Sequence, residues 1–386
     1  MSFCYICFMF FSDILGHESI KTHLLQTIEN KRVAHAQLFV GKEGNGALMT
    51  AIAYAKEILC SESLNAEACQ LKTEKLQHPD LHFSFPITTT KKHSKDPKCD
   101  YFIEQWREFI LNNPYGTLYE WLQFMDSENK QGIINVAEAK SITEKLLLKS
   151  YEGGYKICVI WMAEKMNTDS GNRLLKLIEE PPEKTIFLLV TEDKDSILKT
   201  ILSRCQIIEF PPLSEADVSR GLIEQFNISE SDARKIAIQA DGNFNKAMHI
   251  YKNDDNNAIF EGWFITWIRA AFKAKGNASV INDLIEWSNE IASNNRETQK
   301  QFLDFCLLFF RQALLFNYNA KELVFLETKT PGFKLSKFAP FVHGNNIINI
   351  DQEINDAIYH IERNGNAKII LLDLSIKLTR LLHTKE

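Results

Sequence analysis

The chain lacks several features that would place it in a familiar class of protein. No apolar run approaches the roughly 18 residues that a membrane-spanning helix needs, so the sequence predicts no membrane segment. It also lacks an excess of positive charge: 44 Lys and Arg stand against 50 Asp and Glu, giving a formal net charge of -6. This balance argues against a broad basic surface wrapped by nucleic acid.

Paired metal-binding cysteines are missing too. The chain has eight cysteines, but none of their spacings gives the doubled C-x-x-C pattern of a structural zinc site. The candidate ligands are Cys60 and Cys69, and His78, His82 or Cys99 could in principle complete a site with them. Because these residues offer too few well-spaced ligands, we expect free, partly buried thiols at Cys60 and Cys69 and no zinc.

The N-terminal segment, residues 1–10, is apolar and lacks the basic region that begins a signal peptide. Its lone C-x-x-C, at Cys4 and Cys7, has no second pair and is weak evidence for any site. We expect these residues to be an extension before a domain that begins at Phe11. The cysteine spacings give no disulfide framework, which predicts a cytoplasmic location.

The 386 residues suffice for two or three domains, and 45% hydrophobic with 24% charged residues is typical of a globular protein. Apolar runs predict buried strands at residues 38–40, 156–162 and 185–190. Helical patterns lie before and between them, at residues 19–30, 47–59, 136–149 and 167–180. This alternation predicts a parallel α/β sheet in a domain spanning residues 11–212. Residues 84–131 interrupt it as an insertion, whose second helix begins with a capping box at Thr117 and Glu120.

The pattern beyond residue 212 is helical. Ser214 and Ser229 are N-cap residues of a small helical unit, residues 213–257. The remainder, residues 258–386, predicts a second helical domain. Within it, residues 302–316 are apolar on nearly every side, which predicts a helix buried in a bundle or against another subunit.

A glycine loop at residues 41–48 reads Gly-Lys-Glu-Gly-Asn-Gly-Ala-Leu. Gly41 and Gly46 keep the spacing of the phosphate-binding pattern G-x-x-x-x-G-K-[ST], and a strand and a helix flank the loop as that pattern requires. Ala47 stands in place of the lysine and Leu48 in place of the hydroxyl that binds Mg²⁺. Backbone N–H groups from Gly44 to Gly46 can still form a weak anion nest, which leaves residual nucleotide binding open.

Four segments resemble the AAA+ clamp-loader subunits of bacterial DNA polymerase III. They are residues 13–17, residues 35–41, residues 172–182 (Asn-Arg-Leu-Leu-Lys-Leu-Ile-Glu-Glu-Pro-Pro) and residues 203–206 (Ser-Arg-Cys-Gln). The resemblance covers residues 11–250, whereas the helical tail matches in kind only. It implies an α/β AAA+ module with a parallel sheet, a small helical lid and an all-α collar domain. In lacking the loop lysine, the chain resembles the delta-prime branch of the family.

The resemblance also implies a function in DNA replication. Clamp loaders are five-subunit rings that open a sliding clamp and load it onto primed DNA for the polymerase. The resemblance implies that members of the delta-prime branch act as a stator in the ring and do not hydrolyse ATP themselves. Its implied partners are gamma/tau-type ATPase subunits and the delta subunit, with the clamp and DNA reached through the complex. Arg204, framed by Ser203 and Cys205, matches the arginine that reaches into a neighbouring ATP site, and a guanidinium suits phosphoryl oxygens.

Other positions of the family pattern agree with a loss of ATPase chemistry. Trp161 and Met162 align with the acid pair that supports Mg²⁺ and the attacking water, and Glu164 lies two residues too far along to replace it. Lys246 takes the place of an arginine that contacts the γ-phosphate, which keeps the charge but loses the bidentate fork. Thr191 matches the residue that senses the γ-phosphate. We therefore expect no hydrolysis, no cofactor and no metal.

Two other functions remain open at the level of sequence. One is a nucleotide-binding AAA+ ATPase or switch with a degenerate loop, which would bind and turn over ATP as a monomer. The other is a DNA-binding adaptor that uses the basic residues 91–95 on phosphates. The acidic balance of the chain makes the adaptor the poorer alternative.

Overall fold

The computed structural model describes residues 10–63, 65–90, 92–127, 130–252, 254–274, 280–324, 326, 328, 330–363 and 365–384. Nearly all of the predicted N-terminal extension, with Cys4 and Cys7, lies outside these residues, as does Lys91 of the basic segment. The chain divides into two compact units, Met1–Ile250 and Tyr251–Glu386.

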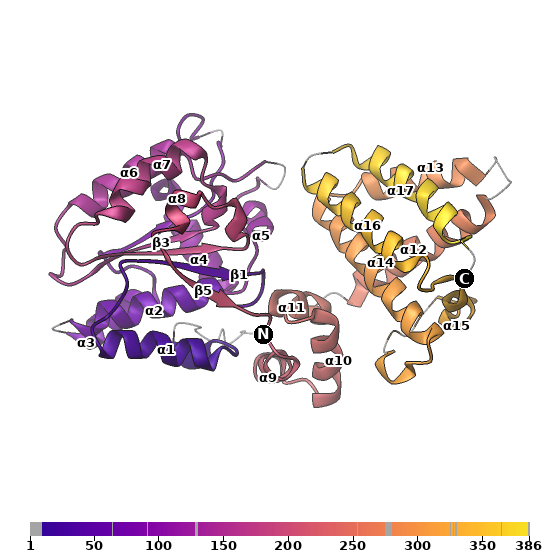
Figure 1. Ribbon diagram of the computed structural model, residues 1–386, viewed down its shortest axis with the longest axis horizontal. Helices are drawn as coiled ribbons and strands as arrows, with labels where there is room; N and C mark the ends of the chain where they lie inside the picture. Colours follow the sequence, from indigo (N-terminus) through magenta and orange to yellow (C-terminus); the bar gives the residue numbers. More distant parts are fainter. Residues whose placement is uncertain are drawn as a thin grey trace. The chain divides into compact units, whose positions relative to one another are not determined.

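A five-stranded parallel sheet forms the centre of the first unit (Figure 1). Its strands are β1 (Ala36–Gly41), β2 (Leu81–Ser84), β3 (Lys156–Trp161), β4 (Thr185–Thr191) and β5 (Gln206–Phe210). They are arranged in the order β2-β3-β4-β1-β5, and each neighbouring pair is parallel. Every residue of β3 and β4 is buried, as expected for parallel strands covered on both faces. The predicted α/β sheet is therefore confirmed.

Helices cover both faces of this sheet (Figure 1). One face carries α1 (Glu18–Glu29), α2 (Ala47–Ser61) and α3 (Ala66–Glu74), and the other carries α6 (Val136–Leu147), α7 (Thr168–Glu179) and α8 (Lys199–Leu202). Because strand side chains alternate between faces, Ile157 and Val159 of β3 join the core beneath α2. Their neighbours Cys158 and Ile160 join a separate core with α6 and α7.

The predicted insertion forms a short 3-10 helix (Cys99–Phe102) followed by α4 (Ile103–Asn112) and α5 (Leu118–Phe124). The capping box of α5 is confirmed, because Glu120 N–H donates to Thr117 Oγ1 and Thr117 N–H donates to the Glu120 carboxylate. Two fully buried tryptophans, Trp106 and Trp121, come from these helices. The ring of Trp106 lies 5.0 Å from that of Trp161 at the end of β3, so the insertion packs into the core beside the glycine loop.

Three further helices complete the first unit: α9 (Glu215–Phe226), α10 (Glu230–Ala240) and α11 (Phe244–Lys252). Ser214 and Ser229 cap α9 and α10 as predicted, each accepting a backbone N–H three residues later. Val218, Leu222 and Phe244 are completely buried in the same hydrophobic cluster as α2 and the sheet. These helices and the α/β module thus share one core.

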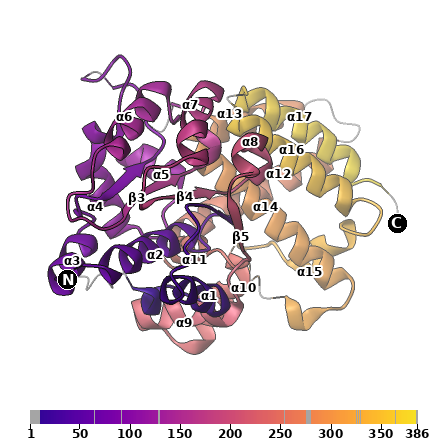
Figure 2. The same ribbon diagram turned by 60° about the vertical axis from the view of Figure 1, so that its left-hand side comes forward.

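The second unit is a bundle built from α12 (Asp254–Ala274), α13 (Ile281–Ala292), α14 (Arg296–Asn317), α15 (Leu335–Phe338), α16 (Ile347–Glu362) and α17 (Ala367–Leu381). Helices α16 and α17 run side by side in both ribbon views (Figures 1 and 2). The predicted burial of residues 302–316 is confirmed, since Phe302, Phe309 and Phe310 of α14 are at most 1% exposed. Trp267 stacks on Trp287, with ring centroids 4.8 Å apart.

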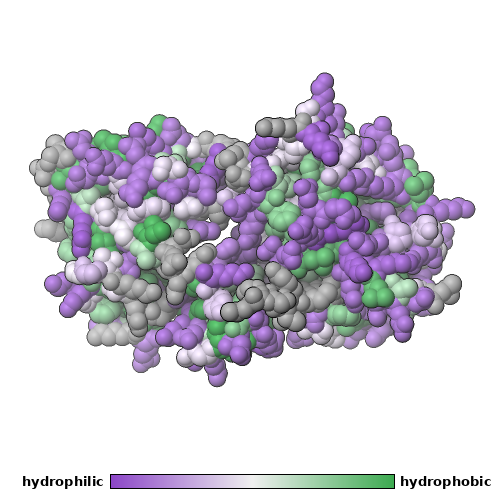
Figure 3. Space-filling view, turned by 180° about the vertical axis from the view of Figure 1, so that it is seen from behind, coloured by the Kyte–Doolittle hydropathy of each residue, from purple (hydrophilic) through white to green (hydrophobic). Residues whose placement is uncertain are grey.

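Among the described residues, no helix is both long and apolar enough to cross a membrane. On the face shown in Figure 3, hydrophobic residues form separate spots in a mostly hydrophilic surface.

The prediction of free thiols at Cys60 and Cys69 is wrong, because the two sulfurs form a disulfide. Cys60 lies near the end of α2 and Cys69 within α3, and the short connection between these helices brings the two Cα atoms to 5.6 Å. That separation lies within the range that a disulfide can bridge. Two of the other residues considered for zinc have protein partners: His78 contacts Glu152, and the Cys99 thiol donates to Phe85 O.

A histidine of β2 makes the stability of this unit sensitive to acid. Burial, assisted by the charge of Lys145, lowers the pKa of His82 to about 4 from a usual 6.5. Between these values the unfolded chain binds more protons than the folded chain, so stability is lost as pH falls from 6.5 towards 4. We expect His82→Gln to reduce this acid-dependent loss by about 3 kcal/mol. Urea unfolding at several pH values measures it, with the exposed His23→Gln as control; parallel curves for wild type and His82→Gln would contradict it.

Candidate functional site

The glycine loop joins the carboxyl end of β1 to the start of α2. Gly44 and Gly46 have φ angles of 69° and 89°, which favour glycine over residues with a Cβ. Asn243, from the segment before α11, lies so close that a Cβ on Gly44 would come within 1.8 Å of its side-chain oxygen. The loop therefore keeps its glycines for backbone shape and for the close approach of α11.

The polar groups of this loop are bonded within the chain. The N–H of Ala47, at the start of α2, donates to Asn45 Oδ1 at 3.1 Å, and Asn45 Nδ2 donates to Phe210 O at 3.1 Å. Gly44 O accepts the N–H of Phe244 at 2.9 Å, and the ring of His17 lies 2.8 Å from Asn45 O. Free N–H groups at a helix start are what bind a phosphate. In this chain the Asn45 side chain takes one of them.

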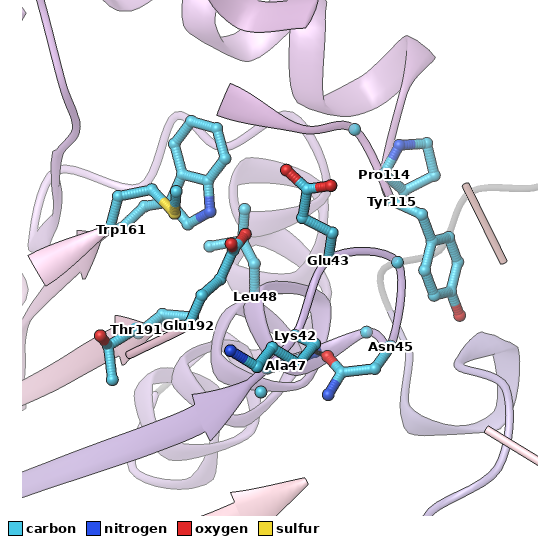
Figure 4. Close-up of a pocket in the computed structure, with 16 residues that line it drawn as sticks. Lys42, Glu43, Asn45, Ala47, Leu48, Pro114, Tyr115, Trp161, Thr191 and Glu192 are labelled. Carbon is cyan, nitrogen blue, oxygen red and sulfur yellow. Dashed lines mark hydrogen bonds between the residues drawn. The ribbon is translucent and has the colours of Figure 1, made fainter. Parts of the chain in front are cut away.

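A small pocket lies over the loop at the carboxyl ends of β1, β3 and β4 (Figure 4). Its lining consists of residues 41–48, 114–116, 161–162 and 190–192. Its volume is about 40 Å³, room for a few water molecules. The structure thus brings the predicted loop residues, including Ala47 and Leu48, together with Trp161 and Met162.

Two carboxylates give this pocket an acidic character. Figure 4 shows the side chains of Glu43 and Glu192 reaching into it from the loop and from the end of β4, while Lys42 extends away from the Glu43 carboxylate. Burial raises the pKa of Glu192 well above its usual range, and the nearby carboxylates of Glu43 and Glu164 raise it further. The raised pKa favours the protonated, neutral form of Glu192, so the negative charge that opposes a triphosphate at this point comes from the Glu43 carboxylate.

Three residues that the sequence analysis compared with catalytic groups of ATPases, Glu164, Thr191 and Lys246, either bond to other groups of the chain or lie outside the pocket. Glu164 does not line the pocket; its carboxylate accepts Thr191 Oγ1 at 2.7 Å and the N–H of Glu192 at 3.3 Å. Thr191 lines the pocket, but its hydroxyl is thereby committed to Glu164. Lys246 is exposed on α11 and does not line the pocket.

Helix α11 is fastened to the insertion through Glu120. The Glu120 carboxylate accepts hydrogen bonds from Asn245 Nδ2 at 2.8 Å and from the N–H of Thr117 at 2.7 Å. It also lies 2.7 Å from His249 Nε2. Burial acts to raise the pKa of Glu120, but these hydrogen bonds outweigh it and hold the pKa below its usual range. Because the N–H of Phe244 also donates to Gly44 O, α11 is bonded both to the insertion and to the glycine loop.

Arg204 lies at the amino-terminal ends of the strands, whereas the pocket lies at their carboxyl ends. It precedes β5, whose first residue, Gln206, pairs with Gln37 near the start of β1. The glycine loop begins only where β1 ends, beside Phe210. Strands rise about 3.3 Å per residue, so Arg204 and the loop are separated by on the order of 20 Å. This arginine is too far away to act on the pocket of its own chain.

The guanidinium of Arg204 is held by three local groups. Its Nη2 lies 3.0 Å from Glu179 Oε1, and its Nη1 donates to Thr200 O at 2.8 Å and more weakly to Ser203 Oγ at 3.4 Å. The side chain remains 32% exposed. Burial raises the pKa of Cys205 to about 11, so its thiol is protonated at neutral pH and is a poor nucleophile.

Several pocket residues were missed by the sequence analysis, namely Glu43, Asn45, Tyr115 and Glu192. Glu192 had a usable signal, because it directly follows a predicted strand and the ends of parallel strands line such pockets. Tyr115 had none: it comes from the insertion, and its hydroxyl accepts the N–H of Leu15, a hundred residues earlier.

Comparison with known proteins identifies the family. A family described as "DNA polymerase III, delta subunit" matches residues 16–214, just over half of the chain. The chain belongs to this family of clamp-loader AAA+ subunits. It is 30% identical over 237 residues to DNA polymerase III subunit delta' of Bacillus subtilis, covering 60% of this chain and 58% of that protein. It is 26% identical over 322 residues to subunit tau of the same organism, covering 79% of this chain and 50% of that protein.

The chain therefore spans between half and three-fifths of the length of these two relatives. Among solved structures, it is similar to a DNA polymerase III gamma subunit-related protein from Thermotoga maritima. The TM-score is 0.38 with 13% identity, over 92% of this chain and 99% of that one. The fold assignment rests on the sheet order and on the family rather than on this superposition.

Proposed function

We propose that this clamp-loader subunit is the non-hydrolysing stator of its assembly. In this proposal it stands beside a gamma/tau-type ATPase subunit and the delta subunit, and it supplies Arg204 to the neighbour's ATP site. Sliding clamp and primed DNA are engaged through the complex. The α9–α11 segment is the lid, and the second, helical unit is the collar that joins the ring.

The observation that carries this proposal is the separation of two features on one sheet. At the carboxyl ends of the strands, the glycine loop has Ala47 and Leu48 where an ATPase has its lysine and hydroxyl, and Trp161 and Met162 stand where the acid pair would be. Glu43 and Glu192 line the pocket there. At the amino-terminal ends of the strands, Arg204 is partly exposed and out of reach of that pocket. An arginine finger acts on a nucleotide that another subunit holds. This arrangement suits a chain that contributes to hydrolysis without performing it.

The attachment of the lid also supports a stator. A nucleotide switch needs a lid that moves when nucleotide arrives. Here Phe244 is bonded to the loop, Glu120 is bonded to α11, and the lid shares the core of the α/β module. Opening the lid would break these contacts and expose buried apolar surface. The same contacts disfavour the alternative function, an ATPase or switch with a degenerate loop.

Restoring the loop residues tests the loss of ATPase chemistry. We expect neither Ala47→Lys nor Ala47→Lys combined with Leu48→Thr to hydrolyse ATP, because Trp161 and Met162 can hold neither Mg²⁺ nor the attacking water. Phosphate release by the purified chain measures this, with a gamma/tau-type subunit as positive control. Mg²⁺-dependent turnover in either variant, or in the wild-type chain alone, would favour the switch over the stator.

A further inference from the structure

We propose that Glu179 is a positioning residue for Arg204, which holds the guanidinium in the orientation offered to the neighbouring nucleotide. This inference rests on the finger assignment proposed above. It starts from one contact, the 3.0 Å ion pair between Arg204 Nη2 and Glu179 Oε1.

Glu179 has a firm base. It is the last residue of α7, and the prolines at 181 and 182 prevent the helix from continuing. Leu174 and Ile178 of α7 are completely buried, in the same core as Ile201 of α8. Because α7 leads into β4 and α8 leads into β5, both helices end near the amino-terminal ends of the strands, where Arg204 lies. The carboxylate and the arginine are therefore mounted on two elements that share one core.

The geometry fixes the guanidinium plane. Arg204 Nη2 donates to Glu179 Oε1 and Nη1 donates to Thr200 O at 2.8 Å, so two acceptors hold two different nitrogens. A guanidinium is planar and carries five N–H donors, so holding two of them sets the direction of the others. Donors remain for phosphoryl oxygens, and the arginine needs little further ordering when a nucleotide meets it.

The pair is poorly suited to a role in folding stability. Glu179 is 51% exposed and Arg204 32% exposed, and ion pairs in such positions contribute little to the free energy of unfolding. Its removal should therefore leave the fold and the assembly intact. Any effect on catalysis then reports the placement of the guanidinium.

Glu179→Gln tests this in the reconstituted loader, with clamp, primed DNA and ATP, and with the other ATP sites inactivated. We expect kcat at the site beside Arg204 to fall about fivefold, the factor for loss of a partly exposed ion pair. Half-saturation by ATP and assembly, followed by size-exclusion chromatography, should not change. Glu180→Gln is the matched control: Glu180 is the next residue, is exposed and forms no ion pair among the described residues. It should leave kcat unchanged.

A double-mutant cycle separates positioning from a structural effect. In the Arg204→Ala background, Glu179→Gln should have no further effect. An equal loss in both backgrounds would show that Glu179 acts through the fold and would overturn the proposal. So would an unchanged or increased kcat for Glu179→Gln while Arg204→Ala is impaired, and the finger assignment would then stand alone. If Arg204→Ala itself has no effect, the proposed function fails and this inference fails with it.

Discussion

Replacing Arg204 with alanine should lower ATP hydrolysis at the neighbouring subunit's site at least a hundredfold. Arginine fingers contribute about 10³–10⁵ to kcat in other NTPases, because they offset charge that develops on the transferred phosphoryl group. The purified chain cannot report this, so the measurement needs the reconstituted loader with the other ATP sites inactivated. Assembly should persist, since Arg204 is a single, partly exposed side chain.

Two further variants sharpen this test. Arg204→Lys keeps the charge but loses the planar fork, so it should recover only a small part of the lost rate. Arg173→Ala removes an equal charge from α7, on which Arg173 is exposed, and should leave hydrolysis at wild-type level. Equal rates for wild type and Arg204→Ala would remove the finger assignment.

Replacing Trp106 with alanine should destabilise the first unit by about 3–5 kcal/mol, the usual cost of removing a large buried aromatic side chain. Trp106 is completely buried and stacks on Phe85, with ring centroids 4.4 Å apart. It also packs against Trp161, which lines the pocket, so the insertion helps to fill the space beside the loop. Urea unfolding, followed by amide exchange in β3 and α4, measures the difference.

The matched comparison is Trp→Phe at two neighbouring positions. Trp106 Nε1 has no hydrogen-bond partner among the described residues, whereas Trp121 Nε1 donates to Pro86 O at 2.8 Å. The change in size is the same at both sites. Trp121→Phe should therefore cost about 1–2 kcal/mol more than Trp106→Phe, because it also leaves a buried carbonyl unpaired. Equal costs would contradict this account of the aromatic cluster.

Local signals in the sequence predicted much of the first unit. The runs at 156–162 and 185–190 became β3 and β4, because a strand buried on both faces needs apolar residues at every position. Capping residues marked the starts of α5, α9 and α10. Strand β5 was missed because it is the outermost strand of the sheet: three of its five residues are exposed, so no continuous apolar run marks it.

The sequence by itself determined that the glycine loop lacks its lysine and hydroxyl, because covalent identity at a fixed spacing is enough to remove that chemistry. Tertiary structure alone decided what occupies the site instead. Glu192, Tyr115 and Asn243 meet the loop from segments distant along the chain. It also decided that Cys60 bonds to Cys69 and that Glu179 meets Arg204. Such contacts depend on how helices and strands pack, which no short stretch of sequence specifies.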